Sequence, residues 1–182
     1  MSIQKFDSTT IALEALVAGF QVTGSLVCNG DGETISEAGN SGGLGNHTDF
    51  QLLMALRKQG EIVLTSGATF RADDYKFPSN SDLAVLTRGS VEILIPKGRR
   101  LHTLNSSYLD SLRDLRQLGY QRIHVEFGER GLKELVNAHA MDALIISSPS
   151  EIGLEILAHK LGVIEKNYRV RDLFVKVVAF QR

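Results

Sequence analysis

The sequence predicts an α/β fold in which helices cover both faces of a mainly parallel sheet. Short unbroken apolar runs, such as residues 62–65 and 83–86, are typical of strands buried on both faces. Stretches with apolar residues at helical spacing, such as residues 108–118, alternate with these runs. Such an alternation produces crossover connections and therefore a parallel sheet. The length of 182 residues suits one domain, so we expect residues 1–182 to form a single domain.

The apolar run at residues 18–28 predicts the first strand. It ends in the turn-rich stretch Asn-Gly-Asp-Gly at residues 29–32, and a glycine-rich loop follows at residues 38–45. Loops of this length in compact domains are usually functional or disordered. The single cysteine, Cys28, excludes an internal disulfide and indicates a reducing compartment. Its apolar surroundings favour a buried, inert thiol over a nucleophile.

A helix is expected after the glycine-rich loop. Asn46 or Thr48 can cap its start, and Gly60 is expected to follow its end, near residue 58. Arg57 falls at the next helical position of the apolar stripe, so its guanidinium is expected along the edge of the buried face. The stripe itself is predicted to consist of Phe50, Leu53 and Met54.

The remaining elements follow in the same alternation. A strand at 62–65 breaks at Gly67, and further strands are expected at 83–86 and 93–95, the last stopped by Pro96. In residues 122–127, apolar and charged residues alternate, which predicts a strand with two distinct faces. The other predicted elements are helices at 108–118 and 132–136, a strand at 144–146, and one long or bent C-terminal strand at 168–180, expected to be antiparallel.

Charge and composition limit the possible partners. The formal net charge is −1, which gives no basic field for nucleic-acid binding. The N-terminal ten residues lack the basic start and apolar stretch of a signal peptide, and no run of about 18 apolar residues occurs. We therefore expect a soluble, cytoplasmic protein with no membrane partner. The five histidines show no metal-ligand spacing, so no metal is expected.

Ligands of parallel α/β sheets bind beyond the carboxyl ends of the strands. Four places in this chain meet that description: residues 29–32, 66–74, 87–90 and 126–131. Backbone N–H groups at residues 66–69, with the Thr69 hydroxyl, could cradle a phosphate; the simpler alternative is a turn with glycine at positive φ.

The charged residues at these strand ends have two interpretations each. Asp73 could contact a ligand, or it could pin the loop by accepting backbone N–H bonds. Thr87 and Arg88 could hold a ribose phosphate, or they could form an ordinary polar turn. Glu126 could bind a substrate amide or donate a proton if burial raised its pKa; the alternative is a structural salt bridge to Arg122.

Four stretches, in order, resemble the reductase domain of bacterial riboflavin-biosynthesis deaminase-reductases. They are CNGDG at 28–32, TDFQLLMALR at 48–57, VLTSGATFRADDYKFP at 63–78, and HVEFGERGLKELVNAHAMDALIISSP at 124–149. The resemblance covers about residues 18–150. It implies a dihydrofolate-reductase-like fold, a homodimer, and NADPH-dependent reduction of the ribosyl group of a phosphoribosylamino-pyrimidine.

The resemblance also implies roles for individual residues. Asp31 would lie where cofactor and substrate meet, and Asp31 and Glu126 are the candidate catalytic proton donors. Ser41, Arg57 and Glu126 would face the phosphorylated substrate. The residues implied for NADPH are Thr69, Asp73, Thr87, Arg88, Gly128, Glu129, Arg130 and Gly131.

Several positions depart from the family pattern. Phe127 stands for the first glycine of a glycine pair and Glu129 for a proline, so Phe127 keeps or blocks the approach of the cofactor. Asn80 stands where the family tends to place an arginine for the substrate phosphate. Tyr75 replaces a proline, and Glu33 replaces a basic residue. These departures leave two alternatives open: a reductase of the same fold for another heterocycle, and a non-catalytic nucleotide-binding module.

Overall fold

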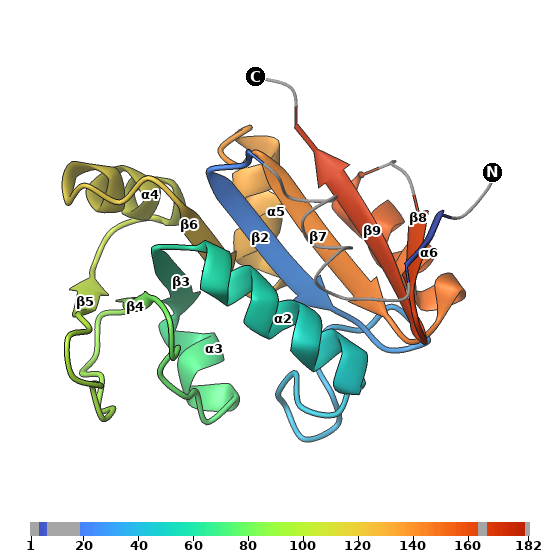
Figure 1. Cartoon of the computed structure of the whole chain (residues 1–182), viewed down its shortest axis with the longest axis horizontal. Helices are drawn as coiled ribbons and strands as arrows, with labels where there is room; N and C mark the ends of the chain where they lie inside the picture. The colour runs from blue at the N-terminus through green and yellow to red at the C-terminus, as the bar shows by residue number, and fades with distance from the viewer. Residues whose placement is uncertain (1–3, 7–18, 164–166, 181–182) are drawn as a thin grey trace.

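The computed structural model describes residues 4–6, 19–163 and 167–180, and their strands form one sheet in the order β1-β8-β9-β7-β2-β6-β3-β4-β5 (Figure 1). Neighbouring strands are parallel except at β8–β9 and β9–β7. This confirms the mainly parallel sheet and the antiparallel C-terminal strand. The strands are β1 (Gln4–Phe6), β2 (Val22–Val27), β3 (Ile62–Ser66), β4 (Asp82–Leu86), β5 (Leu101–Leu104), β6 (Ile123–Glu126), β7 (Ala143–Ser148), β8 (Asn167–Val170) and β9 (Leu173–Ala179).

Helices cover both faces of the sheet, as the sequence predicts. One face is covered by α4, α5 and α6, whose leucines form one buried cluster with strand residues such as Leu64, Val125 and Ile146. The opposite face is covered by α2, which packs on Ile145 and Val175. Successive strand residues point to opposite faces of the sheet. Each apolar strand therefore contributes side chains to the hydrophobic core on both faces. The helices are α2 (His47–Gln59), α3 (Gly67–Ala72), α4 (Tyr108–Gln117), α5 (Glu129–Asn137) and α6 (Glu151–Leu161).

Helix α2 has the expected ends, but its buried stripe differs from the prediction. The Asn46 side chain accepts the Asp49 N–H at 3.0 Å, and the Gly60 N–H closes the last turn. Leu52 and Leu56 are buried, whereas Phe50 is 57% exposed, so the predicted stripe is wrong. Apolar residues occupy adjacent positions in α2. The sequence pattern alone therefore does not show which side of the helix packs on the sheet.

Two other strand predictions are wrong. Residues 93–95 form no strand; Leu94 is 90% exposed, and the edge strand is β5 instead. Pro96 lacks a backbone N–H, so this run is a poor partner for β4. The tail is a hairpin of β8 and β9 rather than one strand, because Arg171 turns the chain with φ 55°. The first strand starts at Val22, later than predicted, and residue 18 lies outside the described residues.

Helix α6 begins against the turn that follows β2, and this close approach requires glycine at position 153. A Cβ on Gly153 would lie 2.0 Å from the carbonyl oxygen of Asn29. Only glycine lets the two backbones come this close.

We predict that Gly153→Ala destabilises the protein by about 1–3 kcal/mol, because the backbone at Asn29 must shift. Urea unfolding at equilibrium measures the change. Gly128→Ala is the control, since its Cβ would meet no atom within 4 Å and should change stability by less than about 0.5 kcal/mol. Equal effects of the two variants would contradict this explanation.

Candidate functional site

The loops that follow β2, β6, β3 and β4 lie at the same edge of the sheet. These four strands are adjacent and parallel, and Thr65 of β3 pairs with Glu126 of β6. The Thr65 hydroxyl also donates to the Glu126 carbonyl oxygen at 3.0 Å. Thr69 and Gly128 follow these two neighbouring strands, so their loops start side by side. The four places that the sequence selects therefore meet at one edge, which we call the carboxyl edge.

A buried ion pair between Arg57 and Glu126 lies on the α2 side of this edge. The Arg57 Nε and Nη2 atoms donate to the two carboxylate oxygens of Glu126 at 2.6 and 2.7 Å. The Tyr75 hydroxyl donates to Glu126 Oε2 at 2.5 Å, and the guanidinium lies over the Tyr75 ring at 4.8 Å. Arg57 and Glu126 come from α2 and β6, and Tyr75 follows α3, so this cluster joins three elements.

The ion pair keeps Glu126 ionised. Burial alone would raise the pKa of this carboxyl, but the hydrogen bonds and charge of Arg57 outweigh it, and the pKa falls below its ordinary value. A carboxylate held in this form is a poor proton donor at neutral pH. Arg122 pairs with Glu61 at 3.2 Å. The alternative expected from the sequence, a salt bridge between Glu126 and Arg122, is therefore also wrong. Glu126 is a structural anchor for Arg57.

His124 extends this cluster under α2. Burial, followed by the charge of Arg57, lowers the pKa of His124 to about 4 even though Glu126 acts in the opposite direction. The ring is therefore neutral at pH 7. Its Nδ1 and Nε2 atoms lie 3.0 Å from the hydroxyls of Thr23 and Ser25, respectively. Strand β6 consequently has a polar face and an apolar face, as predicted, but both faces are buried.

Asp73 fastens the glycine-rich loop to the segment after α3. Its carboxylate accepts the Ser41 backbone N–H at 2.8 Å and the Ser41 hydroxyl at 3.0 Å. This is the loop-pinning role that the sequence left open for Asp73. The bonds bring Ser41 to the carboxyl edge, beside the segment that carries Tyr75.

The Asp49 carboxyl group also lies near this edge, and the sequence analysis did not select it. Asp49 Oδ1 accepts the Ser147 hydroxyl at 2.5 Å, next to the end of β7. Burial raises the pKa of Asp49, although the Ser147 hydrogen bond opposes the shift. A Cβ on Gly45 would lie 2.2 Å from Asp49 Oδ2, so the glycine-rich loop passes directly over this carboxyl. An acidic residue in a first helical turn ordinarily indicates capping, which is why sequence alone gives no sign of this position.

Residues 66–69 lead into a helix, so the alternative of a simple turn with glycine at positive φ is wrong. Ser66 caps α3 by accepting the Thr69 N–H at 3.1 Å, and the two hydroxyls lie 3.0 Å apart. Gly67 has no positive φ; its place is fixed by Thr87, whose Oγ1 would lie 2.6 Å from a Cβ at this position. The end of β4 and the start of α3 are therefore in close contact.

The segment after β6 starts α5 without a side-chain cap. Gly128 is the N-cap residue and is exposed, and Arg130 is exposed in the first turn. Phe127 is 2% exposed and packs on the Tyr108 ring, with 4.8 Å between the ring centroids, so its side chain belongs to the buried core. Gly131 is needed for this packing, because a Cβ there would lie 2.9 Å from both residues.

The other selected residues are more exposed. Asp31 is exposed in the turn after β2, where its N–H donates to the Asn29 side chain at 2.9 Å. Arg88 is exposed just after β4, and Asn80 is exposed before it, bonded to Ser79.

Burial raises the pKa of Cys28 to about 11, which agrees with the expected inert thiol.

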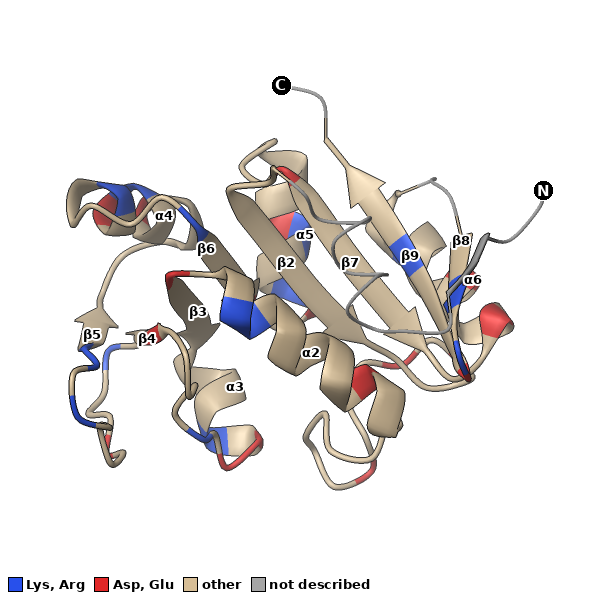
Figure 2. Cartoon of the chain, in the orientation of Figure 1, with Lys and Arg blue, Asp and Glu red and all other residues tan. Residues whose placement is uncertain are grey.

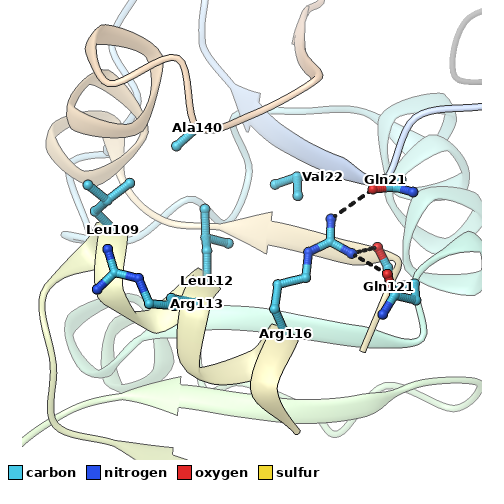
Figure 3. A pocket seen from close by; sticks show the side chains of 8 residues that line it. All are labelled: Gln21, Val22, Leu109, Leu112, Arg113, Arg116, Gln121 and Ala140. Atoms are coloured by element: carbon cyan, nitrogen blue, oxygen red, sulfur yellow. Dashed lines mark hydrogen bonds between the residues drawn. The ribbon is translucent and has the colours of Figure 1, made fainter. Parts of the chain in front are cut away.

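A hollow of about 440 Å³ lies at the opposite edge of the sheet, beside the amino ends of β2 and β6 (Figure 3). Arg116 crosses it and donates to Gln121 and Gln21. None of the residues selected from the sequence lines it.

In the described residues, no group of three or more His, Cys, Asp or Glu side chains could hold a metal ion. No helix among these residues is long and apolar enough to cross a membrane.

Comparisons with known proteins identify the fold. No protein-family model and no curated protein sequence matches the chain. A pyrimidine reductase-like protein from Corynebacterium diphtheriae matches with a TM-score of 0.70 and 13% identity, over 96% of this chain and 99% of that chain. A diaminohydroxyphosphoribosylaminopyrimidine deaminase/5-amino-6-(5-phosphoribosylamino)uracil reductase from Thermotoga maritima matches with a TM-score of 0.65 and 14% identity, over 94% of this chain and 60% of that chain. RibD from Acinetobacter baumannii matches with a TM-score of 0.63 and 13% identity, over 93% and 61%.

The chain thus has the fold of these proteins, which confirms the fold that the sequence resemblance implies. Its match to the Corynebacterium protein extends over nearly the full length of both chains, whereas it spans about three fifths of the other two. At these identities the likeness concerns the fold. The chemistry has to be argued from the residues at the carboxyl edge.

We predict that Arg57→Ala lowers the free energy of unfolding by about 3–5 kcal/mol, because Glu126 would remain buried without its counter-charge. Tyr75→Phe should cost about 1–2 kcal/mol, since Glu126 loses one hydrogen bond but keeps the guanidinium. Urea unfolding measures both changes. Lys58→Ala, at the exposed neighbouring position, is the control. A change at Arg57 no larger than that at Lys58 would show that the ion pair is not a structural anchor.

Proposed function

We propose that this protein is an NADPH-dependent reductase of a phosphoribosylamino-pyrimidine, of the 5-amino-6-(5-phosphoribosylamino)uracil reductase type, in riboflavin biosynthesis. The observation that carries the proposal is the full-length match in fold to a pyrimidine reductase-like protein. The four sequence stretches of the reductase pattern also support it, because three of them include residues at the carboxyl edge and the fourth forms most of α2. The protein acts as a homodimer in this proposal.

The cofactor would lie across the ends of β6, β3 and β4. Gly128, Glu129, Arg130 and Gly131 follow β6, and Thr69 lies in α3 after β3. The exposed start of α5 offers backbone N–H groups to a pyrophosphate, since no side chain caps them. Thr87 and Arg88 would meet the 2′-phosphate. Asp73 would act indirectly, because its carboxylate already holds Ser41.

The substrate would lie between this site and α2. Ser41 presents its hydroxyl on a loop that Asp73 fixes, while Arg57 and Glu126 form a rigid polar floor. When bound, NADPH would supply the hydride that reduces the C1′ of a ring-opened sugar imine, and one proton delivered to the imine nitrogen would complete the ribitylamine. The protein orients the substrate and provides that proton.

We assign the proton to Asp49 and retain Asp31 as the alternative. Glu126 is ionised by its pairing with Arg57, which leaves it without a proton to give. Asp49 lies near the same edge, and burial raises its pKa, so its carboxyl stays protonated to higher pH than an ordinary aspartate. Figure 2 shows that α2 carries acidic charge toward its start and basic charge toward its end.

A second candidate is a reductase of the same fold that acts on another heterocycle. Both carboxylate oxygens of Glu126 and two nitrogens of Arg57 are engaged with each other, so Arg57 has little capacity left for a substrate phosphate. Asn80 also stands in place of a phosphate-binding arginine and is bonded to Ser79. A non-catalytic nucleotide-binding module remains the further alternative, and the binding and turnover measurements below distinguish it.

The decisive assay follows NADPH oxidation at 340 nm with the deaminated phosphoribosylamino-pyrimidine as substrate. We expect substrate-dependent oxidation of NADPH, with the ribityl product identified by mass spectrometry. NADPH binding with no turnover of this substrate would favour another heterocycle. No saturable binding of NADPH or NADH in a fluorescence titration would rule out the reductase proposal altogether.

We predict that Asp49→Asn lowers kcat by about 10²–10⁴-fold while the Kd for NADPH stays unchanged. In the unaltered protein the rate should fall as pH rises through the pKa of Asp49, because only the protonated acid donates. This limb of the pH profile should vanish in Asp49→Asn and persist in Asp31→Asn. Loss of the limb in Asp31→Asn alone would assign the proton to Asp31.

A further inference from the structure

The hollow of about 440 Å³ beside the amino ends of β2 and β6 has no role in the proposed function. Its volume falls within the range of small-molecule sites, about 300–1,000 Å³. Strand β2 (Val22–Val27) runs from this hollow to the carboxyl edge. It spans about 20 Å at about 3.3 Å per residue, so a ligand in the hollow would be separate from one at the carboxyl edge.

Part of the hollow is lined by apolar side chains. Val22 and Leu112 are 3% and 7% exposed and belong to the hydrophobic core, so their positions are fixed. Leu109 and Ala140 continue this lining toward the surface, and Leu109 is 40% exposed. Leu109 and Leu112 come from α4, whereas Val22 and Ala140 lie across from them (Figure 3). This lining suits the apolar body of a small ligand.

Arg116 forms the polar end of the hollow. Its Nη1 atom donates to the backbone oxygens of Tyr120 and Gln121 and to the Gln121 side chain, and its Nη2 atom donates to Gln21 Oε1 at 3.2 Å. All of these acceptors are neutral. The Nε–H has no acceptor in the described part of the chain, and Figure 3 shows the Nε atom on the side of the guanidinium that faces Leu112. The guanidinium is therefore held in place and keeps a donor for an anion.

The carboxylates near the hollow are engaged elsewhere. Glu61 accepts the N–H groups of residues 121–122 at 2.6 and 2.9 Å, and Asp142 accepts those of residues 21–22 at 2.8 Å. No salt bridge joins either carboxylate to Arg116 within the described ranges. Among the causes that lower the pKa of Glu61, its backbone hydrogen bonds come first and the charge of Arg116 comes last. The positive charge of Arg116 is therefore not neutralised by a direct partner.

Arg113 adds a second positive charge on the other side of Leu112 (Figure 3). It is exposed and pairs with Asp110, one turn earlier in α4, at 2.7 Å. Exposed pairs of this kind contribute little free energy, so the Arg113 side chain can turn toward an anion at low cost.

We propose that this hollow binds a small organic carboxylate, with its carboxylate group on Arg116 and its apolar body against Leu112 and Val22. The inference does not depend on the proposed function. A carboxylate is planar and matches the donors of a guanidinium, and the apolar lining favours a ligand with a hydrocarbon or aromatic body over an inorganic ion. Because Gln21 and Gln121 already hold Arg116, binding does not have to order this side chain.

The test titrates the ¹⁵N-labelled protein with benzoate and follows the backbone amide shifts by NMR. We expect saturable shifts at Val22, Leu112 and Ala140 with a Kd of about 1–10 mM, as suits a ligand of this size. Benzamide has nearly the same shape and no charge, so it should bind about tenfold more weakly or worse. Arg116→Gln should weaken benzoate binding about tenfold or more, and Arg116→Lys should keep part of it because the charge remains.

Arg99→Gln is the matched control variant. Arg99 also donates to a neutral oxygen, the backbone carbonyl of Ser79 at 3.2 Å, but it does not line the hollow. This variant should keep the benzoate affinity within about twofold. The amide spectrum of Arg116→Gln shows whether that variant is folded; if it is not, the comparison of Arg116→Lys with Arg99→Gln decides.

Other results would overturn the inference. One is the absence of saturable benzoate shifts up to about 50 mM. Another is an equal response to benzamide or to inorganic phosphate, since the hollow would then not select a carboxylate with an apolar body. A third is unchanged benzoate affinity in folded Arg116→Gln. Displacement of benzoate by NADPH would place both ligands in one site and contradict the inference, whereas failure of NADPH to bind at all would affect only the proposed function.

Discussion

The parallel pairing of β2, β6, β3 and β4 is the constraint on which the candidate site depends. Each of these strands carries a different part of the proposed chemistry in the loop that follows it. Residues far apart in sequence, from Asp31 to Arg130, reach one edge only because no strand in this group is reversed. The antiparallel strands β8 and β9 lie beyond β7, outside this group, so the reversal of direction leaves the edge intact.

The Arg57–Glu126 pair explains how a polar site can exist in a core of this kind. Burying either charge alone is costly, so the pair is stable only with its geometry complete. Arg57 supplies two donors, Tyr75 a third, and His124 remains neutral beside them. The tyrosine departs from the proline of the sequence pattern that this chain resembles, and it contributes a hydrogen bond to Glu126.

The sequence predicts the architecture well and the roles of its polar residues less well. Residues 62–65 and 83–86 are almost continuously apolar, a pattern typical of strands buried on both faces, and both predictions are confirmed. Phe50 was misplaced because α2 has apolar residues on adjacent positions, and packing decides between them. The partner of Glu126 was unpredictable because Arg57 and Arg122 are equally plausible cations until the sheet brings one of them within 2.6 Å.

Asp49 could not be selected for a similar reason. It has the pattern of an ordinary helix-terminal charge in sequence, and only the tertiary structure shows that Ser147 and Gly45 enclose it. Strand order is the property that converts such isolated residues into a site.

A crystal structure of the protein with NADPH tests the central claim most directly. The account requires the dinucleotide to extend along the ends of β6, β3 and β4, with its nicotinamide toward α2. Nucleotide density in the hollow beside Arg116, at the opposite edge of the sheet, would contradict it.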